Sequence, residues 1–270
     1  MGPRRHYRYL FLGCIATFFA ASVSYADLTT ASTAPLYTAA SVVQAASQTA
    51  GALAPNTLAT IYGTNLSWTT HALTAADLTS GTLPTSLDGV TVYMGNILCS
   101  LFFVSPGQIN FLIPYEIVAQ NVSLYIVRQG VAGPVVNLRF AVGAPGFFQW
   151  NGSFALAQHA DGRLITASAP AQPGEVIVLY ATGLGRTSPD LSSGHVASGA
   201  INILYLSQLQ VLLDGVPRPA SSIYYAGVTP GFAGLYQINL MLPSAMNANP
   251  AIQVTMGSQS SPASVFLYAQ

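Results

Sequence analysis

One sequence element occurs twice in this chain, and this repeat restricts the possible folds more than any other feature. Each copy contains a Pro-Gly pair, then Gln-Ile-Asn, then three apolar residues and a closing proline; the copies span residues 104–114 and 228–243. A Pro-Gly pair is typical of a turn and the apolar run of a short strand, which the proline ends because it cannot donate to a ladder. The repeat therefore predicts a β-rich chain built from two related units.

A second set of related segments accompanies these copies in the same order. Residues 55–66 align with residues 173–184 at a constant offset of 118, and Leu-Asp-Gly-Val occurs at 87–90 and again at 213–216. Short apolar runs separated by Gly, Pro, Asn and Asp continue through both halves, which is typical of immunoglobulin-like domains of about 100 residues. We predict an all-β fold of two tandem immunoglobulin-like β-sandwiches that arose by internal duplication.

The composition along the chain predicts its division into segments. Residues 27–50 are dominated by Thr, Ala and Ser, and we interpret them mainly as a linker that has room for a first edge strand near 41–43. The first sandwich is predicted at 51–145 and the second at 146–270. The start of the second unit, 146–171, is interpreted as a bridging hairpin.

The N-terminus has the pattern of a secretory signal peptide, predicted at residues 1–26. Three arginines among the first eight residues precede an apolar segment at 10–23, and 24–26 supplies a small-x-small cleavage pattern. An uncleaved anchor is the alternative, although the apolar segment is short for a membrane span. We expect export by the general secretory route to the periplasm, the cell surface or the medium, with no membrane span after cleavage.

The charge content of the chain limits its partners. Only 6% of the residues are charged, there is no lysine, and beyond residue 26 five arginines face eight acidic residues. A nucleic-acid binder needs a basic surface, so nucleic acid is excluded as a partner. A surface of low charge suits neutral contacts with a cell-envelope protein or polysaccharide, and exposed sheet edges would allow self-association.

Few residues of the mature chain could carry catalysis or hold a metal. Signal cleavage would leave Cys99 as the sole cysteine, and its apolar surroundings predict a buried thiol instead of a nucleophile. His71, His159 and His195 have no metal-type spacing, so no metal or cofactor is expected. His159 and Asp161 come nearest to a catalytic pair, but a solvated histidine at a hairpin tip is the simpler interpretation.

Two tryptophans are the remaining candidates for ligand contacts. Trp68 and Trp150 both lie in predicted loops, where a tryptophan can present a flat face to a sugar or to a partner protein. The alternative is that each tryptophan closes one end of its sandwich. We therefore predict an exported, non-enzymatic binding or structural module, with a polysaccharide or ester hydrolase that uses His159 and Asp161 as the alternative.

The repeated motifs also carry a family resemblance that covers the chain from about residue 40 to 270. The motifs lie at 54–66, 104–114, 159–162, 173–184 and 234–239. Together they resemble a recurring C-terminal domain of secreted acidobacterial proteins, and each half resembles an IPT/TIG immunoglobulin-like domain. The resemblance implies an exported β-rich module, usually found at the end of larger proteins. It implies no established activity that could be carried over to this chain.

Overall fold

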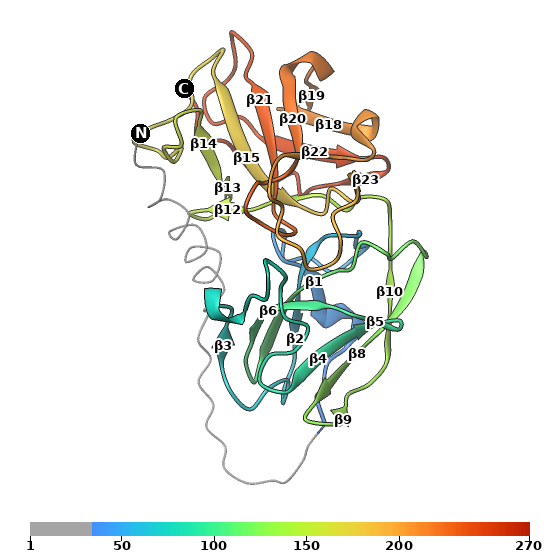
Figure 1. Ribbon diagram of the computed structural model, residues 1–270. Helices are drawn as coiled ribbons and strands as arrows, with labels where there is room; N and C mark the ends of the chain where they lie inside the picture. The colour runs from blue at the N-terminus through green and yellow to red at the C-terminus, as the bar shows by residue number, and fades with distance from the viewer. Residues whose placement is uncertain (1–33) are drawn as a thin grey trace.

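The structure is a computed structural model that describes residues 34–270, so the predicted signal peptide and residues 27–33 lie outside the described residues. The described chain contains β-strands and four single-turn 3-10 helices, with no α-helix among them. The strands form two tandem sandwiches, one above the other in Figure 1. The predicted all-β, immunoglobulin-like fold is confirmed. No helix within residues 34–270 has the length and apolar character that crossing a membrane requires.

The first sandwich consists of two antiparallel sheets. One sheet has the order β1-β2-β7-β6-β3, with β1 (Val42–Gln44), β2 (Leu58–Tyr62), β7 (Gln108–Leu112), β6 (Ser100–Val104) and β3 (His71–Ala72). The other has the order β10-β8-β4-β5 with β9 beside β8, namely β10 (Val136–Arg139), β8 (Asn121–Arg128), β4 (Val90–Met94), β5 (Ile97–Leu98) and β9 (Val131–Ala132). The 3-10 turns are η1 (Ala39–Ser41) and η2 (Ala75–Asp77). Alternate residues of both sheets face each other and form one buried apolar core.

The second sandwich has the same plan with a longer first sheet. That sheet runs β11-β15-β21-β20-β17-β16 with β14 beside β15, namely β11 (Gly146–Phe147), β15 (Val176–Thr182), β21 (Tyr236–Met241), β20 (Ile223–Val228), β17 (Ile201–Ile203), β16 (Thr187–Ser188) and β14 (Ala157–His159). Its partner sheet runs β19-β18-β22-β23, with β19 (Val216–Pro217), β18 (Leu209–Leu213), β22 (Ile252–Met256) and β23 (Gln259–Ser260). A separate hairpin pairs β12 (Gln149–Trp150) with β13 (Phe154–Ala155), and the 3-10 turns are η3 (Leu206–Gln208) and η4 (Ala220–Ser222).

The repeated Gln-Ile-Asn element has the same register in both units. In the first unit β7 pairs with β2 so that Asn110 lies opposite Thr60, and in the second β21 pairs with β15 so that Asn239 lies opposite Val178. The side chain of the Gln in each copy donates to the Asn two residues later, at 2.9 Å in the first and 3.0 Å in the second. The two long sequence repeats are therefore structural equivalents, at pairing positions as well as in order.

A β-bulge is duplicated as well. The pairing of β6 with β7 shifts between Leu101 and Phe103, and the pairing of β20 with β21 shifts between Ile223 and Tyr225. The extra residue is Phe102 in the first unit. In the second unit the equivalent extra residue is Tyr224. Because bulges re-aim a strand, the two sheets bend at the same point.

The predicted alignment of the two Leu-Asp-Gly-Val segments is wrong. In the sheet order, β18 and β19 of the second unit correspond to β4 and β5 of the first. Residues 213–216 join β18 to β19, so their counterpart in the first unit is 94–97, which joins β4 to β5. Residues 87–90 form an earlier turn that precedes β4. The Asp and the Gly have positive φ in both turns. Asp-Gly is a local signal for a tight turn at any hairpin, so its recurrence does not establish equivalence.

The first edge strand predicted near residues 41–43 is confirmed, but the described residues around it also pack into the fold and do not form the predicted linker. Residues 42–44 form the edge strand β1, which pairs with β2, and Val42, Val43 and Gln44 are all buried. The Gln44 side chain donates to the carbonyl of Ala144 at 2.7 Å, and its oxygen accepts from the Ser47 N–H at 2.8 Å. Small and uncharged residues suited this segment to burial at a junction, and their composition alone did not distinguish that role from a linker.

The two sandwiches meet over a buried polar contact. The Thr182 hydroxyl accepts from the Leu58 N–H at 2.9 Å and donates to the Gly234 carbonyl at 2.8 Å, so one side chain satisfies backbone groups of both units. Gly183 follows with φ +81°, and a Cβ there would lie 1.9 Å from the Ala144 oxygen. Sheet membership divides between β10 and β11, where the sequence places the boundary. The predicted domain bounds, 51–145 and 146–270, stay predictions.

Candidate functional site

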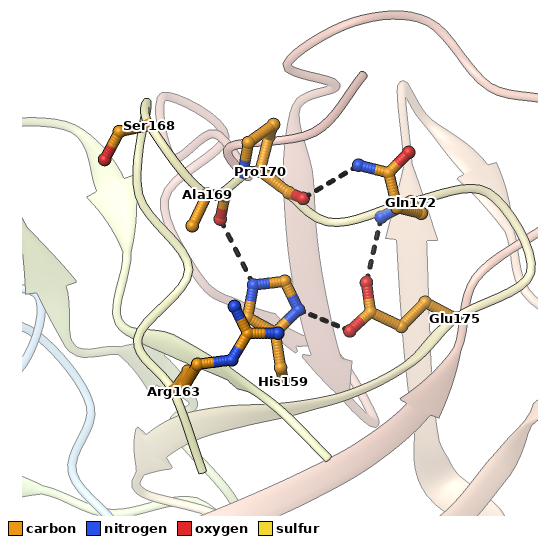
Figure 2. A pocket seen from close by; sticks show the side chains of 7 residues that line it. All are labelled: His159, Arg163, Ser168, Ala169, Pro170, Gln172 and Glu175. Atoms are coloured by element: carbon orange, nitrogen blue, oxygen red, sulfur yellow. Dashed lines mark hydrogen bonds and ion pairs between the residues drawn. The ribbon is translucent and has the colours of Figure 1, made fainter. Parts of the chain in front are cut away.

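An open pocket of about 490 Å³ lies in the second unit, where the hairpin at β14 meets the start of β15. His159 ends β14 opposite Ile177 of β15, and this pairing brings Glu175, just before β15, beside the imidazole. Figure 2 shows His159 between Glu175 and the backbone of the 168–170 loop. The strand register therefore assembles a histidine–carboxylate pair from residues 16 positions apart.

The polar groups of this pocket are occupied by one another. Nδ1 of His159 lies 2.5 Å from Oε1 of Glu175, and Nε2 lies 3.2 Å from the carbonyl oxygen of Ala169. The second carboxylate oxygen of Glu175 accepts from the Gln172 N–H at 2.9 Å. Both ring nitrogens therefore already have protein oxygens as hydrogen-bond partners. These contacts connect the 168–170 loop to the hairpin at β14.

The predicted pairing of His159 with Asp161 does not occur. Asp161 instead accepts from Arg163, at 3.0 Å from its N–H and 2.7 Å from its Nε, and these hydrogen bonds hold the pKa of the Asp161 carboxyl below its usual range. A carboxylate that bonds the backbone two residues on is a turn former. The prediction of a solvated histidine is also wrong, since His159 is buried. The sequence held no local signal for Glu175 as the partner.

Trp68 forms a cation–π contact that the sequence did not indicate. The Arg128 guanidinium carbon lies 3.7 Å from the centroid of the indole, and the Arg128 side chain also donates to the backbone carbonyl of Asn65. Arg128 is 1% exposed, and this burial lowers the pKa of its guanidinium. Trp68 itself is 49% exposed. The indole thus has a buried cation on one side and solvent on the other.

The loop that carries Trp68 is fixed at both ends. Leu66 is fully buried, and its N–H donates to the Pro106 carbonyl at 3.1 Å. After the tryptophan, the Thr69 hydroxyl donates to Asp88 at 2.5 Å, and the Thr69 N–H donates to the Ser67 hydroxyl at 3.2 Å. Because the chain is anchored on each side, the exposed indole is held in one orientation.

His71 continues this anchored segment. Its Nδ1 lies 3.0 Å from Asp88 and its Nε2 lies 3.3 Å from Asp77, so the ring bridges two carboxylates. The hydrogen bond to Asp88, and then the one to Asp77, raise the pKa of His71. The pKa of Asp88 is lowered, first by the Thr69 hydroxyl and then by His71. The result is a clamp that joins β3, the η2 turn and the turn before β4.

Trp150 occupies a different part of the molecule. It is half-buried in β12 and packs against the apolar cluster that lies between the units. Trp68 contacts Arg128 beside β9, at the end of the first unit remote from the second, whereas β12 lies near the junction (Figure 1). The two tryptophans therefore form separate surfaces. Their roles as ligand contacts stay predictions.

The remaining candidate residues are Cys99 and His195. Cys99 is fully buried, which confirms the predicted buried thiol, and burial raises the pKa of that thiol. His195 is exposed in the loop after β16, with its ring 3.5 Å from the Thr82 hydroxyl of the first unit. Within the part of the chain that the structure describes, no three His, Cys, Asp or Glu side chains are grouped so as to hold a metal ion.

The sheet order and the family match agree on the class of fold. Residues 41–142 match the IPT/TIG domain family, so the first unit has an IPT/TIG-like immunoglobulin fold. Solved structures that resemble the chain include the extracellular region of plexin A4, SGBP-B from a complex xyloglucan utilization locus in Bacteroides uniformis, and the tandem Ig repeats of Dlar.

These structural likenesses are weak. Sequence identities are 13%, 10% and 12%, and TM-scores are 0.27, 0.26 and 0.20, over 93%, 88% and 67% of this chain respectively. The chain spans 20% of the plexin chain, 50% of the SGBP-B chain and 81% of the Dlar chain. Scores of this size carry no argument, so the fold class rests on the sheets and the IPT/TIG match. No curated protein matches the chain.

Proposed function

We propose that this protein is an exported, non-enzymatic binding module that contacts a protein or polysaccharide of the cell envelope. The observation that carries the proposal is Trp68, a half-exposed indole held against a buried guanidinium by an anchored loop. Leaving so large an aromatic surface in water is unfavourable unless a partner covers it. Trp68 is the principal contact in this proposal.

The fixed orientation of Trp68 favours recognition. A partner that binds a mobile side chain must pay for the side-chain freedom that is lost, and an indole already held by Arg128 avoids most of that loss. Rigid aromatic side chains are the usual anchors of binding surfaces for this reason. Trp150, which is half-buried at the junction, is a secondary contact.

The hydrolase alternative has less support from the geometry. It required His159 and Asp161 to act together, but His159 bonds Glu175 and Ala169, and Asp161 bonds Arg163. Both ring nitrogens of the histidine already have protein hydrogen-bond partners. The non-enzymatic interpretation is therefore preferred.

The cellular setting of the proposal comes from the sequence. The signal-like pattern at residues 1–26 supports export, and the low charge content supports neutral contacts at the cell envelope. Membership in the recurring C-terminal domain family of secreted acidobacterial proteins is part of the same proposal. Self-association through exposed sheet edges is an additional route to assembly at the cell surface.

Binding measurements on residues 27–270 test the proposal. The purified chain is mixed with envelope protein fractions in pull-downs and with insoluble polysaccharides in sedimentation assays. Trp68→Ala is expected to weaken the captured interaction at least about tenfold, in the range of an aromatic hot spot. Trp68→Phe keeps a ring over Arg128 and should have an intermediate effect. Tyr224→Ala, which removes a 58% exposed aromatic from the second unit, is the matched control.

Two results would overturn the proposal. The first is wild-type affinity in Trp68→Ala with an unchanged melting curve, which removes Trp68 as the contact. The second is hydrolysis of a polysaccharide or ester by the wild-type chain that is lost in His159→Ala without loss of fold. Capture of a polysaccharide or of a protein, abolished by Trp68→Ala, supports the proposal and identifies the class of partner.

A further inference from the structure

A second cavity lies between the two sandwiches, far from Trp68. Its volume is about 160 Å³, and both units line it. The first unit contributes the outer face of the β2-β7-β6 sheet and the segment around η2, and the second contributes the loop before β21 with neighbouring residues. The lining residues are Ala45, Leu58, Ala59, Leu73, Leu78, Leu83, Phe102, Phe103, Asn110, Phe111, Phe148, Val196, Gly231, Phe232, Ala233 and Leu235.

The lining of this cavity is almost entirely apolar. None of the lining side chains is ionisable, and several are large aromatic or aliphatic groups from both units. A charged ligand would lose its hydration there without gaining a partner of opposite charge, so the cavity disfavours ions. An apolar cavity of about 150 Å³ is large enough to bind benzene. The volume therefore fits a single ring with a small substituent.

Asn110 is the one lining residue with a polar side chain. Its Oδ1 accepts from the Thr60 hydroxyl at 3.0 Å and from the Gln108 amide at 2.9 Å. These two donors fix which end of the amide is oxygen and which is nitrogen. Both of these hydrogen bonds use Oδ1, so they leave the Nδ2 donors of Asn110 to a ligand or to solvent.

We propose that this cavity is a binding site for a small uncharged molecule with one aromatic or aliphatic ring and one acceptor oxygen. The ring packs against the apolar walls, including Phe102 from the first unit and Phe148 from the second. The acceptor oxygen receives a hydrogen bond from Nδ2 of Asn110. A pocket that is mostly apolar, with one polar group to set orientation, is the usual composition of a small-molecule site. The proposal is independent of the recognition surface at Trp68.

The second unit provides an internal comparison for this assignment. Asn239 occupies the same register position as Asn110 and accepts the equivalent hydrogen bond from Gln237 at 3.0 Å. It does not line the cavity between the units. A substitution at Asn239 thus changes an amide with the equivalent Gln partner, although it lies opposite Val178 instead of Thr60, and it does so without the site.

Ligand titrations with three one-ring probes test the site in residues 27–270. Binding is followed by amide chemical shifts in NMR spectra, with acetophenone, ethylbenzene and benzoate as probes. Acetophenone is expected to bind saturably and to shift amides around residues 73–83 and 231–235. Ethylbenzene lacks the acceptor and should bind about fivefold more weakly, the effect of one hydrogen bond. Benzoate, which is charged, should not bind.

Three variants separate the site from general effects. Asn110→Asp keeps the acceptor for Thr60 and Gln108 but removes the donor, so acetophenone binding should fall at least about fivefold. Asn239→Asp is the matched control and should leave binding unchanged. Val196→Phe fills the cavity from a half-buried position and should abolish binding of acetophenone and ethylbenzene alike.

The possible outcomes decide the proposal. Saturable acetophenone binding that is lost in Val196→Phe and retained in Asn239→Asp supports it. The cavity assignment is overturned if neither acetophenone nor ethylbenzene binds saturably, or if Val196→Phe binds as the wild type does. Equal affinity for acetophenone and ethylbenzene overturns the role of Asn110. If Asn110→Asp does not fold, the comparison of the two probes in the wild-type chain decides that role.

Discussion

The two units present the same sheet face in opposite surroundings. In the first unit the cross-strand pair Leu58 and Leu112 is buried, because the loop around Gly234 of the second unit packs on it. The equivalent pair in the second unit is Val176 and Met241, and Met241 is 36% exposed. The register and the Gln-to-Asn hydrogen bond are the same in both faces, so the difference in exposure lies in what covers them.

The difference in exposure between the two sheet faces comes from a few side chains. The bulge residue Phe102 packs into the apolar cluster at the junction, whereas its equivalent Tyr224 is 58% exposed. Asn65 and Gly183 are equivalent turn residues with φ of +56° and +81°, but only Gly183 has a neighbouring carbonyl where its Cβ would lie. The comparison shows that a duplicated sheet became an interface through side-chain changes on one face and one turn position, with the backbone plan retained.

The largest expected effect comes from exchanging these two turn residues. Gly183→Asn should lower the free energy of unfolding by about 3 kcal/mol or more, because the new Cβ overlaps the Ala144 carbonyl. Asn65→Gly keeps the backbone conformation and should change stability by less than about 1 kcal/mol. Urea unfolding of both variants measures the difference. Equal losses would show that the junction does not constrain Gly183.

The next effect compares the covered and open cross-strand pairs. Leu112→Ala removes a side chain that is 3% exposed and should cost about 3 kcal/mol of unfolding free energy, within the range of buried leucines. Met241→Ala, at the equivalent position, should cost less than about 1 kcal/mol because that side chain already contacts solvent. Thermal and urea unfolding would contradict the comparison if the two substitutions cost the same.

A smaller effect is expected from the hydroxyl that joins the units. Thr182→Val keeps the shape of the side chain but leaves the Leu58 N–H and the Gly234 carbonyl without their partner, at a cost of about 2 kcal/mol. Thr64→Val, at the exposed equivalent position, is the control and should stay within about 0.5 kcal/mol of wild type. A neutral Thr182→Val would mean that the contact between the units does not stabilise the fold.

The smallest expected effect concerns how stability depends on pH. This dependence comes from the segment around His71, which borders the covered face. The pKa of His71 is raised above the 6.5 of an unfolded chain, so its clamp contributes full stability below pH 6.5 and loses it as pH rises through the folded value. Between pH 6 and 9 the melting temperature should therefore fall less in His71→Asn than in wild type. Asp88→Asn should flatten the profile more than Asp77→Asn, since Asp88 is the larger cause. Parallel profiles would contradict the clamp.

The sequence predicted the features that depend on local pattern. The Gln-Ile-Asn repeats and the segments at offset 118 lie at equivalent register positions, and Cys99 is buried as its apolar neighbours indicated. Alternation of apolar residues determines which strand face enters a core, so these features can be read along the chain. The Asp-Gly turns at 87–90 and 213–216 were aligned incorrectly because the same dipeptide serves any tight turn.

The site features that were missed depend on contacts between distant segments. Arg128 lies under Trp68 because β8 ends beside the loop after β2, and Glu175 reaches His159 through the pairing of β14 with β15. Neither pair has a characteristic spacing in the sequence. The packing of the residues around the predicted edge strand was missed for a related reason, since small neutral residues suit both a linker and a buried junction.

Because Cys99 is buried in the first sandwich, chemical labelling of its thiol reports how often that sandwich opens. Its thiol is fully buried in the core of that unit, and the second unit contains no cysteine. Because a thiol must reach solvent as thiolate before it reacts, the labelling rate of Cys99 under native conditions is set by how often the first sandwich opens. Comparison of that rate with the global unfolding rate reveals whether the first sandwich opens alone or only together with the second.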